Sequence, residues 1–168
     1  MHLEVRLSAH PLRRLYMFVI KDYEAFSYYT QDMKRQPFEE VEHTADWALR
    51  VWGIDLPDLF KNAAVGMMQL MDVQPAQHEP LVRTIEIEAI DRESLLVAWL
   101  EELLFGMEIR SVTYQDIRIY IDGDTALQAT IEELPLVSIA KPIKAVTFNE
   151  LAIRPIQGGL EVTIVFDV

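Results

Sequence analysis

The sequence predicts an α+β domain with two main helices and mainly antiparallel β-sheets. Three observations predict it. Two segments carry apolar residues at helical spacing, several shorter segments alternate apolar and polar residues, and Asp-Gly and Gly-Gly pairs provide hairpin turns. The order strand, helix, strand, helix and then several strands lacks the strict alternation of a parallel α/β fold.

The first 36 residues differ in pattern from the remainder. They mix arginines, aromatic and polar residues without a clean period of 2 or 3.6. We therefore expect an N-terminal extension at residues 1–36 and the main domain at residues 37–168. Residues 1–32 could also reflect a start assigned upstream of Met33, and a helix around Pro11 to Tyr29 is a further alternative.

The first half of the main domain contains both expected helices. Residues 47–52 alternate as a strand, and Asp55 is placed to cap a helix that carries its apolar face to Met71. Residues 85–89 form a second, half-exposed strand. Asp91 then caps a helix with a wide apolar stripe, and we expect three acidic side chains of this helix to face water: Glu93, Glu101 and Glu102.

The second half is predicted to be rich in β-structure. Asp122-Gly123 joins two alternating segments into a hairpin, and Gly158-Gly159 joins Leu151–Pro155 to Leu160–Asp167. In the last strand Leu160, Val162, Ile164 and Phe166 share one face, so Asp167 falls on the other.

The composition of the chain excludes several classes of function. The net charge of −12 disfavours direct binding to a phosphate backbone and suits a basic protein partner or a bound cation. The chain has no cysteine, which excludes disulfides, thiolate metal sites and cysteine nucleophiles. No apolar run approaches the roughly 20 residues that span a bilayer, so we expect a cytoplasmic protein without membrane contact.

Two distant acidic segments are the main candidate site. Asp46 lies in Glu42–Trp47 and Asp167 lies in Val165–Val168, each at the edge of an apolar strand. Where the sequence stops, Val168 adds a carboxylate. If the fold joins these oxygens, they suit a hard cation such as magnesium or calcium. The simpler alternative is a turn or cap residue at Asp46 and a solvated end at Asp167.

Other polar residues give weaker indications. His43 could donate to Asp46, bind a metal or act as a base, although a structural hydrogen bond is the simpler interpretation. Lys141, Lys144 and Arg154 form a small basic group that ordinary solvated charges also explain. The sequence contains no nucleophile–base motif and no glycine-rich phosphate loop.

From Phe38 onward the chain resembles the archease family. Five segments carry the resemblance in the family's order: Phe38–Asp46, Leu59–Ala64, Asp91–Leu104, Ile143–Phe148, and Gly158-Gly159 through Val168. Two departures stand out. Phe148-Asn149 replaces a frequent tyrosine–histidine pair, and Leu134–Ala140 lacks the family's usual basic and histidine residues.

This resemblance implies a non-catalytic activator of the RtcB-type RNA ligase. That ligase uses GTP and manganese, guanylylates its own histidine, and joins tRNA exons or repairs RNA ends. The family promotes guanylylation and multiple turnover, and RNA is contacted only through the ligase. The resemblance also implies a divalent cation held by Asp46, Asp167 and Val168. Calcium is expected first, with magnesium or manganese as alternatives, and His43 and Lys144 are candidates for nearby contacts.

Two other functions stay open on the sequence. One is a divalent-metal-dependent hydrolase that uses Asp46 and Asp167. The other is a general chaperone-like modulator of nucleic-acid enzymes.

Overall fold

The computed structural model describes residues 36–41 and 47–168. The chain divides into two units, Met1–Gln36 and Pro37–Val168, and the second unit is described here by itself. The predicted extension, with its alternative helix around Pro11 to Tyr29, lies outside the described residues.

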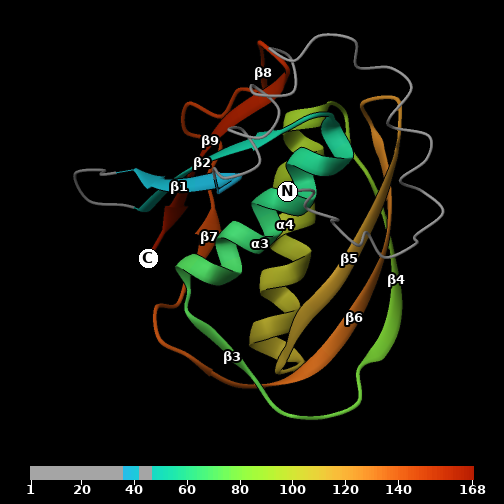
Figure 1. Cartoon of the computed structure of the whole chain (residues 1–168), viewed down its shortest axis with the longest axis vertical. Helices are drawn as coiled ribbons and strands as arrows, with labels where there is room; N and C mark the ends of the chain where they lie inside the picture. The colour runs from blue at the N-terminus through green and yellow to red at the C-terminus, as the bar shows by residue number, and fades with distance from the viewer. Residues whose placement is uncertain (1–35, 42–46) are drawn as a thin grey trace, which may run out of the picture. The chain divides into compact units, whose positions relative to one another are not determined.

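A five-stranded sheet is built around the last strand of the chain (Figure 1). Strands β2 (Trp47–Gly53) and β9 (Gly159–Asp167) run antiparallel at its centre. Strand β1 (Phe38–Val41) pairs with the outer edge of β2. Strands β7 (Ala145–Val146) and β8 (Arg154–Ile156) pair with the two ends of the other edge of β9.

A four-stranded sheet forms the other side of the domain. Its long central strand β6 (Ala126–Ile139) pairs with β5 (Val112–Asp122) along one edge. The other edge of β6 pairs first with β4 (Leu81–Glu88) and then with β3 (Val73–Pro75). Every strand pair among the described residues is antiparallel, which confirms the predicted class.

Both helices start where the sequence predicts. Helix α3 (Leu56–Leu70) is capped by Asp55, whose carboxylate accepts from the Asp58 backbone N–H at 2.9 Å. Helix α4 (Arg92–Ile109) is capped by Asp91, which accepts from the Ser94 N–H at 2.7 Å. Each cap satisfies a backbone N–H in the first turn of its helix, and the Ser94 hydrogen bonds lower the pKa of Asp91.

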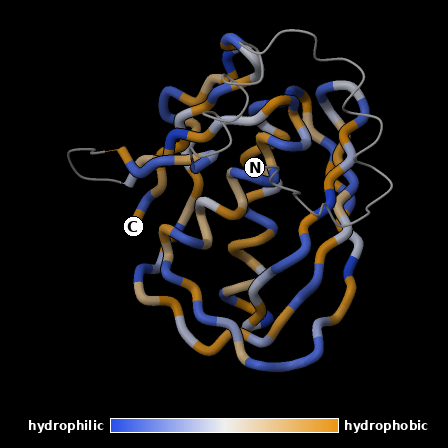
Figure 2. Tube along the Cα trace, viewed as in Figure 1, coloured by the Kyte–Doolittle hydropathy of each residue, from blue (hydrophilic) through white to orange (hydrophobic). Residues whose placement is uncertain are grey.

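The core lies between the two sheets because α3 and α4 each contact strands of both. Figure 2 shows hydrophobic residues recurring along both helices. The largest fully buried side chains include Trp99, Phe60 and Phe166. Trp99 donates its indole N–H to the Phe60 carbonyl at 3.2 Å, which satisfies the buried donor. Within residues 36–41 and 47–168, no helix is both long and apolar enough to span a membrane.

A β-bulge in β5 keeps two large side chains in this core. The pairing with β6 shifts between Gln115 and Arg118, and Asp116 has a positive φ of 44°. The extra residue lets both Tyr114 and Ile117 point inward, and both are buried. The Tyr114 hydroxyl donates to the Leu103 carbonyl at 3.1 Å. Burial raises the pKa of Tyr114 to about 12.

Candidate functional site

Three chain segments meet at the C-terminal end of β9. On one side, Trp47 at the start of β2 lies opposite Phe166. On the other side, Ala145 of β7 lies opposite Asp167, and the Lys144 backbone N–H donates to the Asp167 carbonyl at 2.9 Å. This edge therefore has its backbone paired on both sides, while the Asp167 side chain is exposed to solvent.

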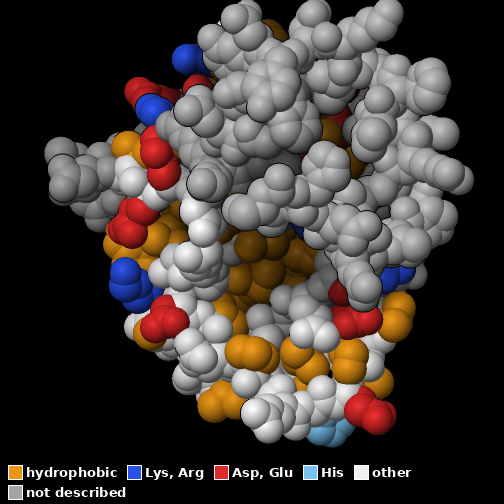
Figure 3. Space-filling view, in the orientation of Figure 1, with side chains coloured by type: hydrophobic (Ala, Val, Ile, Leu, Met, Phe, Trp, Pro, Cys, Tyr) orange, Lys and Arg blue, Asp and Glu red, His pale blue; other side chains and the backbone are white. Residues whose placement is uncertain are grey.

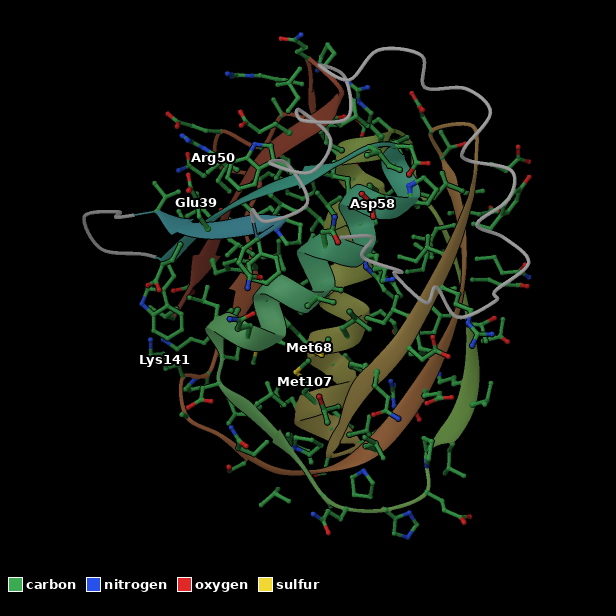
Figure 4. The ribbon with its side chains drawn as sticks, in the orientation of Figure 1. Glu39, Arg50, Asp58, Met68, Met107 and Lys141 are labelled. Carbon is green, nitrogen blue, oxygen red and sulfur yellow. The ribbon has the colours of Figure 1, made fainter. Side chains whose placement is uncertain are left out.

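Two lysines place their ammonium groups at this same edge. Lys144 Nζ donates to a main-chain oxygen of Val168 at 2.6 Å. Lys141 Nζ lies 5.5 Å from the centroid of the Trp47 ring, within the range of a cation–π contact. Figure 4 shows Lys141 at the side of the domain where the C mark of Figure 1 lies. Two positive charges of the chain therefore lie at this edge.

Helix α4 holds β7 from the face opposite to solvent. Glu101 Oε1 accepts from the Val146 N–H at 2.6 Å, which is a short, charge-assisted hydrogen bond. Val146 is 7% exposed, so its backbone N–H depends on this carboxylate. Besides its pairing with β9, β7 is therefore held by one glutamate of the helix.

The expectation that Glu93, Glu101 and Glu102 face water is wrong. All three are half-buried. Glu93 accepts from the Ile153 N–H at 3.0 Å, and Glu102 accepts from Arg83 at 3.1 Å. Helical periodicity separates apolar from polar residues, but it cannot distinguish a solvated carboxylate from one that binds a neighbouring segment.

The predicted strand Leu151–Pro155 is also largely wrong, since β8 covers only Arg154–Ile156. The hydrogen bonds of the Ile153 backbone explain why the strand is shorter than predicted. The N–H of Ile153 donates to Glu93, and the carbonyl accepts from Arg92 Nη2 at 2.8 Å. Side chains of α4 therefore occupy the backbone groups that a sheet partner would use.

The structure describes two of the three predicted cation ligands, Asp167 and Val168. Asp167 and Val168 lie together at the end of β9, and Lys144 lies against both. Asp46 and His43 lie outside the described residues. Within residues 36–41 and 47–168, no cluster of three or more His, Asp or Glu side chains could hold a metal. The oxygens of Asp167 and Val168 suit a hard cation, and they make two of the three predicted ligands.

The basic group predicted from the sequence divides into two parts. Lys141 and Lys144 lie at the end of β9, whereas Arg154 pairs in register with Glu161 near its start. Six residues of extended strand separate these positions, roughly 20 Å along the strand. Figure 3 accordingly shows acidic and basic side chains mixed along the left side of this face.

A separate hollow of about 340 Å³ lies between α3, β3, β5 and β6. Met68 and Thr113 line it, and the Thr113 hydroxyl donates to the Met68 sulfur at 3.7 Å. Among the described residues that line it, Asp72 is the single carboxylate and none is a histidine.

Most of this chain matches one known protein family. The model of the archease protein family matches residues 38–168. The chain belongs to the archease family. The match begins at Phe38 in β1 and ends at Val168, so it includes every element described here.

Curated archeases are similar over nearly their whole length. The protein from Methanosarcina barkeri is 31% identical over 139 residues, which is 78% of this chain and 95% of that archease. The protein from Methanothermobacter thermautotrophicus is 30% identical over 139 residues, which is 78% of this chain and 98% of that archease.

Solved structures share the fold. A solution structure of a Methanobacterium thermoautotrophicum protein has a TM-score of 0.58 and 29% identity, and it covers 80% of this chain and 100% of that one. A Thermotoga maritima crystal structure, described as an archease and possible chaperone, has a TM-score of 0.58 and 18% identity. It covers 77% of this chain and 96% of that one, and at this identity it supports the archease fold alone.

Proposed function

We propose that this protein is a non-catalytic activator of a GTP-dependent RNA-splicing ligase of the RtcB type. It promotes guanylylation of the ligase histidine and multiple turnover in tRNA splicing or RNA repair. It acts through a divalent cation, calcium in the first instance, held by Asp46, Asp167 and Val168. RNA is contacted only by the ligase, and the complex works in the cytoplasm.

Membership of the archease family supports the activator role, and the pairing of Trp47 with Phe166 is the observation that supports the cation site. Trp47 follows Asp46 directly in the chain, and Phe166 directly precedes Asp167. Asp46 and Asp167 are therefore each one residue along the chain from the Trp47–Phe166 pair, and consecutive Cα atoms are about 3.8 Å apart. Oxygen ligands of opposite strands can then share one calcium, which takes 6–8 oxygens in a flexible geometry.

The electrostatics of the chain support a basic partner. With a net charge of −12, the protein is attracted to a positively charged surface of the kind that surrounds a nucleotide pocket. The cation would supply positive charge at the tip of this acidic domain, next to the phosphates of the bound nucleotide. Activation then comes from positioning and electrostatic stabilisation within the ligase, while the phosphoryl transfer stays with the ligase.

The test is a ligation assay with the cognate RtcB-type ligase, GTP and manganese. We expect the wild-type protein to raise the number of RNA ligations per ligase above that of the ligase alone. The stimulation should weaken at high salt, because an encounter between opposite charges is screened. Equal turnover numbers with and without the protein contradict the proposal. Phosphoester hydrolysis by the purified protein alone would favour the hydrolase alternative instead.

A further inference from the structure

The hydroxyl of Thr113 in β5 is buried against a weak hydrogen-bond acceptor. Among the residues that the structure describes, Thr113 is the one buried residue that is neither hydrophobic nor glycine, and it is 4% exposed. Its hydroxyl donates to the Met68 sulfur of α3 at 3.7 Å. Buried hydroxyls need a partner, and a thioether sulfur accepts a hydrogen bond less well than an oxygen does. An oxygen at this position would therefore suit Thr113 better.

Met68 is more accessible than the other methionines that the structure describes. Met67, Met71 and Met107 are 0%, 2% and 3% exposed and belong to the core. Met68 is half-buried and lines the hollow of about 340 Å³ between α3, β3, β5 and β6. Figure 4 shows Met68 on α3 and Met107 on α4. The hollow gives a small reagent access to Met68, whereas the core must open before the other three can react.

We propose that Met68 is an oxidation site, at which hydrogen peroxide forms methionine sulfoxide and the Thr113 hydroxyl then donates to the new oxygen. A lone pair of the sulfur forms a bond to one peroxide oxygen, and the O–O bond breaks. The other oxygen leaves as hydroxide and takes the proton of the transferred oxygen, so the second product is water. The sulfur loses two electrons and the peroxide gains them.

The hollow accommodates the added oxygen. Its volume of about 340 Å³ is several times the roughly 30 Å³ that one water molecule occupies in the liquid. The methionine side chain is flexible, so the sulfoxide can turn toward Thr113. An oxygen added to Met67 or Met71 would instead enter the closely packed core and disrupt it. Oxidation at Met68 is therefore tolerated by the fold, and sulfoxide reductases can reverse it.

The first experiment measures the rate of oxidation at each methionine. The full-length protein is treated with dilute hydrogen peroxide, and sulfoxides are located by tandem mass spectrometry of tryptic peptides. Trypsin cleaves after Lys61 and Arg83, so Met67, Met68 and Met71 are compared within one peptide. We expect Met68 to be oxidised on the order of tenfold faster than Met67, Met71 and Met107, because susceptibility follows exposure.

The second experiment tests the Thr113 hydroxyl by thermal unfolding before and after oxidation. Peroxide treatment is stopped when Met68 is converted and Met67, Met71 and Met107 are intact. Met68→Leu receives the same treatment, and its change in Tm is the baseline for methionines outside the described residues. Wild type should stay within about 1 °C of this baseline. Thr113→Val should fall at least about 3 °C below it, because the sulfoxide oxygen loses its donor.

Two further variants serve as controls. Thr113→Ser keeps the hydroxyl and should respond to oxidation as wild type does. Thr130→Val removes an exposed hydroxyl from the neighbouring strand β6 and should also respond as wild type does. Both comparisons use the difference in Tm between reduced and oxidised protein, so a change in the stability of the reduced variant does not affect them.

The outcomes test the two parts of this inference, and neither part depends on a cation or on the ligase. Oxidation of Met67, Met71 or Met107 at the rate of Met68 overturns the oxidation site. A change in Tm of Thr113→Val equal to that of wild type overturns the role of the hydroxyl. A loss in oxidised Thr113→Ser as large as in oxidised Thr113→Val overturns that role as well.

Discussion

Trp47 of β2 lies directly opposite Phe166 of β9, and this is the last register pair of the two strands at the end where the candidate site lies. Phe166 is fully buried and Trp47 is half-buried, so the pair anchors both strand ends to the core. Antiparallel register then dictates that residues next to the pair share the same edge. Segments more than a hundred residues apart in sequence become neighbours through one cross-strand contact.

The first prediction concerns the hydrogen bond between Glu101 and Val146. Glu101→Leu leaves the Val146 N–H without its acceptor, and we expect a loss of about 1–3 kcal/mol in the free energy of unfolding. Glu101→Gln keeps an acceptor oxygen and should lose less. Urea denaturation measures both.

Glu108→Leu is the matched control, because Glu108 is an exposed residue of the same helix. It should change the free energy of unfolding by no more than about 0.5 kcal/mol. If Glu101→Leu is as stable as Glu108→Leu, the bond from α4 does not hold β7.

The second prediction concerns the opposite end of the same strand pair. A Cβ atom added at Gly159 would lie 2.2 Å from the Gly53 carbonyl oxygen, and that oxygen belongs to backbone that cannot rotate away. Gly159→Ala should therefore destabilise the fold by about 3 kcal/mol through forced backbone movement. Thermal unfolding monitored by circular dichroism provides the measurement.

Gly123 in the β5–β6 hairpin is the comparison. Its φ is +60° and nothing lies near an added Cβ. Asn tolerates this region, so Gly123→Asn should cost under about 1 kcal/mol. A Gly159→Ala protein that unfolds no earlier than Gly123→Asn would show that β2 and β9 can separate without penalty.

The third prediction is a loss of stability at alkaline pH caused by Tyr114. Its pKa rises from 10 to about 12 on folding, mainly because burial disfavours the phenolate. The unfolded chain therefore releases this proton first. The contribution to stability is complete below about pH 10 and is lost as the pH rises through about 12. The loss is at most about 3 kcal/mol.

In Tyr114→Phe the free energy of unfolding should decrease less across this pH window than it does in wild type. The substitution should also remove one late step from the phenolate absorbance titration of the folded protein. Tyr120→Phe, at an exposed position of the same strand, should leave the fall unchanged. The same pH dependence in Tyr114→Phe and wild type would assign the effect to other groups.

Much of the local structure could be predicted because it is encoded by near neighbours. The side chains of Asp55 and Asp91 cap their helices by accepting from backbone N–H groups three residues ahead, and alternation placed Val162, Ile164 and Phe166 on the buried face of β9. These patterns need only a few consecutive residues. They were therefore visible before any tertiary contact was known.

The contacts that shape the site are not local, and the sequence did not predict them. Strand β7 is two residues long, too short for any period to be recognised. Glu101 and Glu93 looked like solvated residues because the segments that they bind lie far along the chain. The cation–π contact of Lys141 with Trp47 likewise depends on the folded arrangement of the edge. The ligand role of Asp46, predicted from the two acidic segments and also implied by the family resemblance, stays a prediction.

The most direct test of the central claim is guanylylation of the partner ligase in the presence of defined variants. Wild type and Asp122→Asn, a control at an exposed hairpin position of the other sheet, should raise the rate of guanylylation of the ligase histidine. Asp46→Ala and Asp167→Asn should leave it at the rate of the ligase alone while retaining the wild-type circular dichroism spectrum. Full stimulation by a folded Asp167→Asn protein would contradict the claim that the proposed cation site at Asp46, Asp167 and Val168 is the activating site.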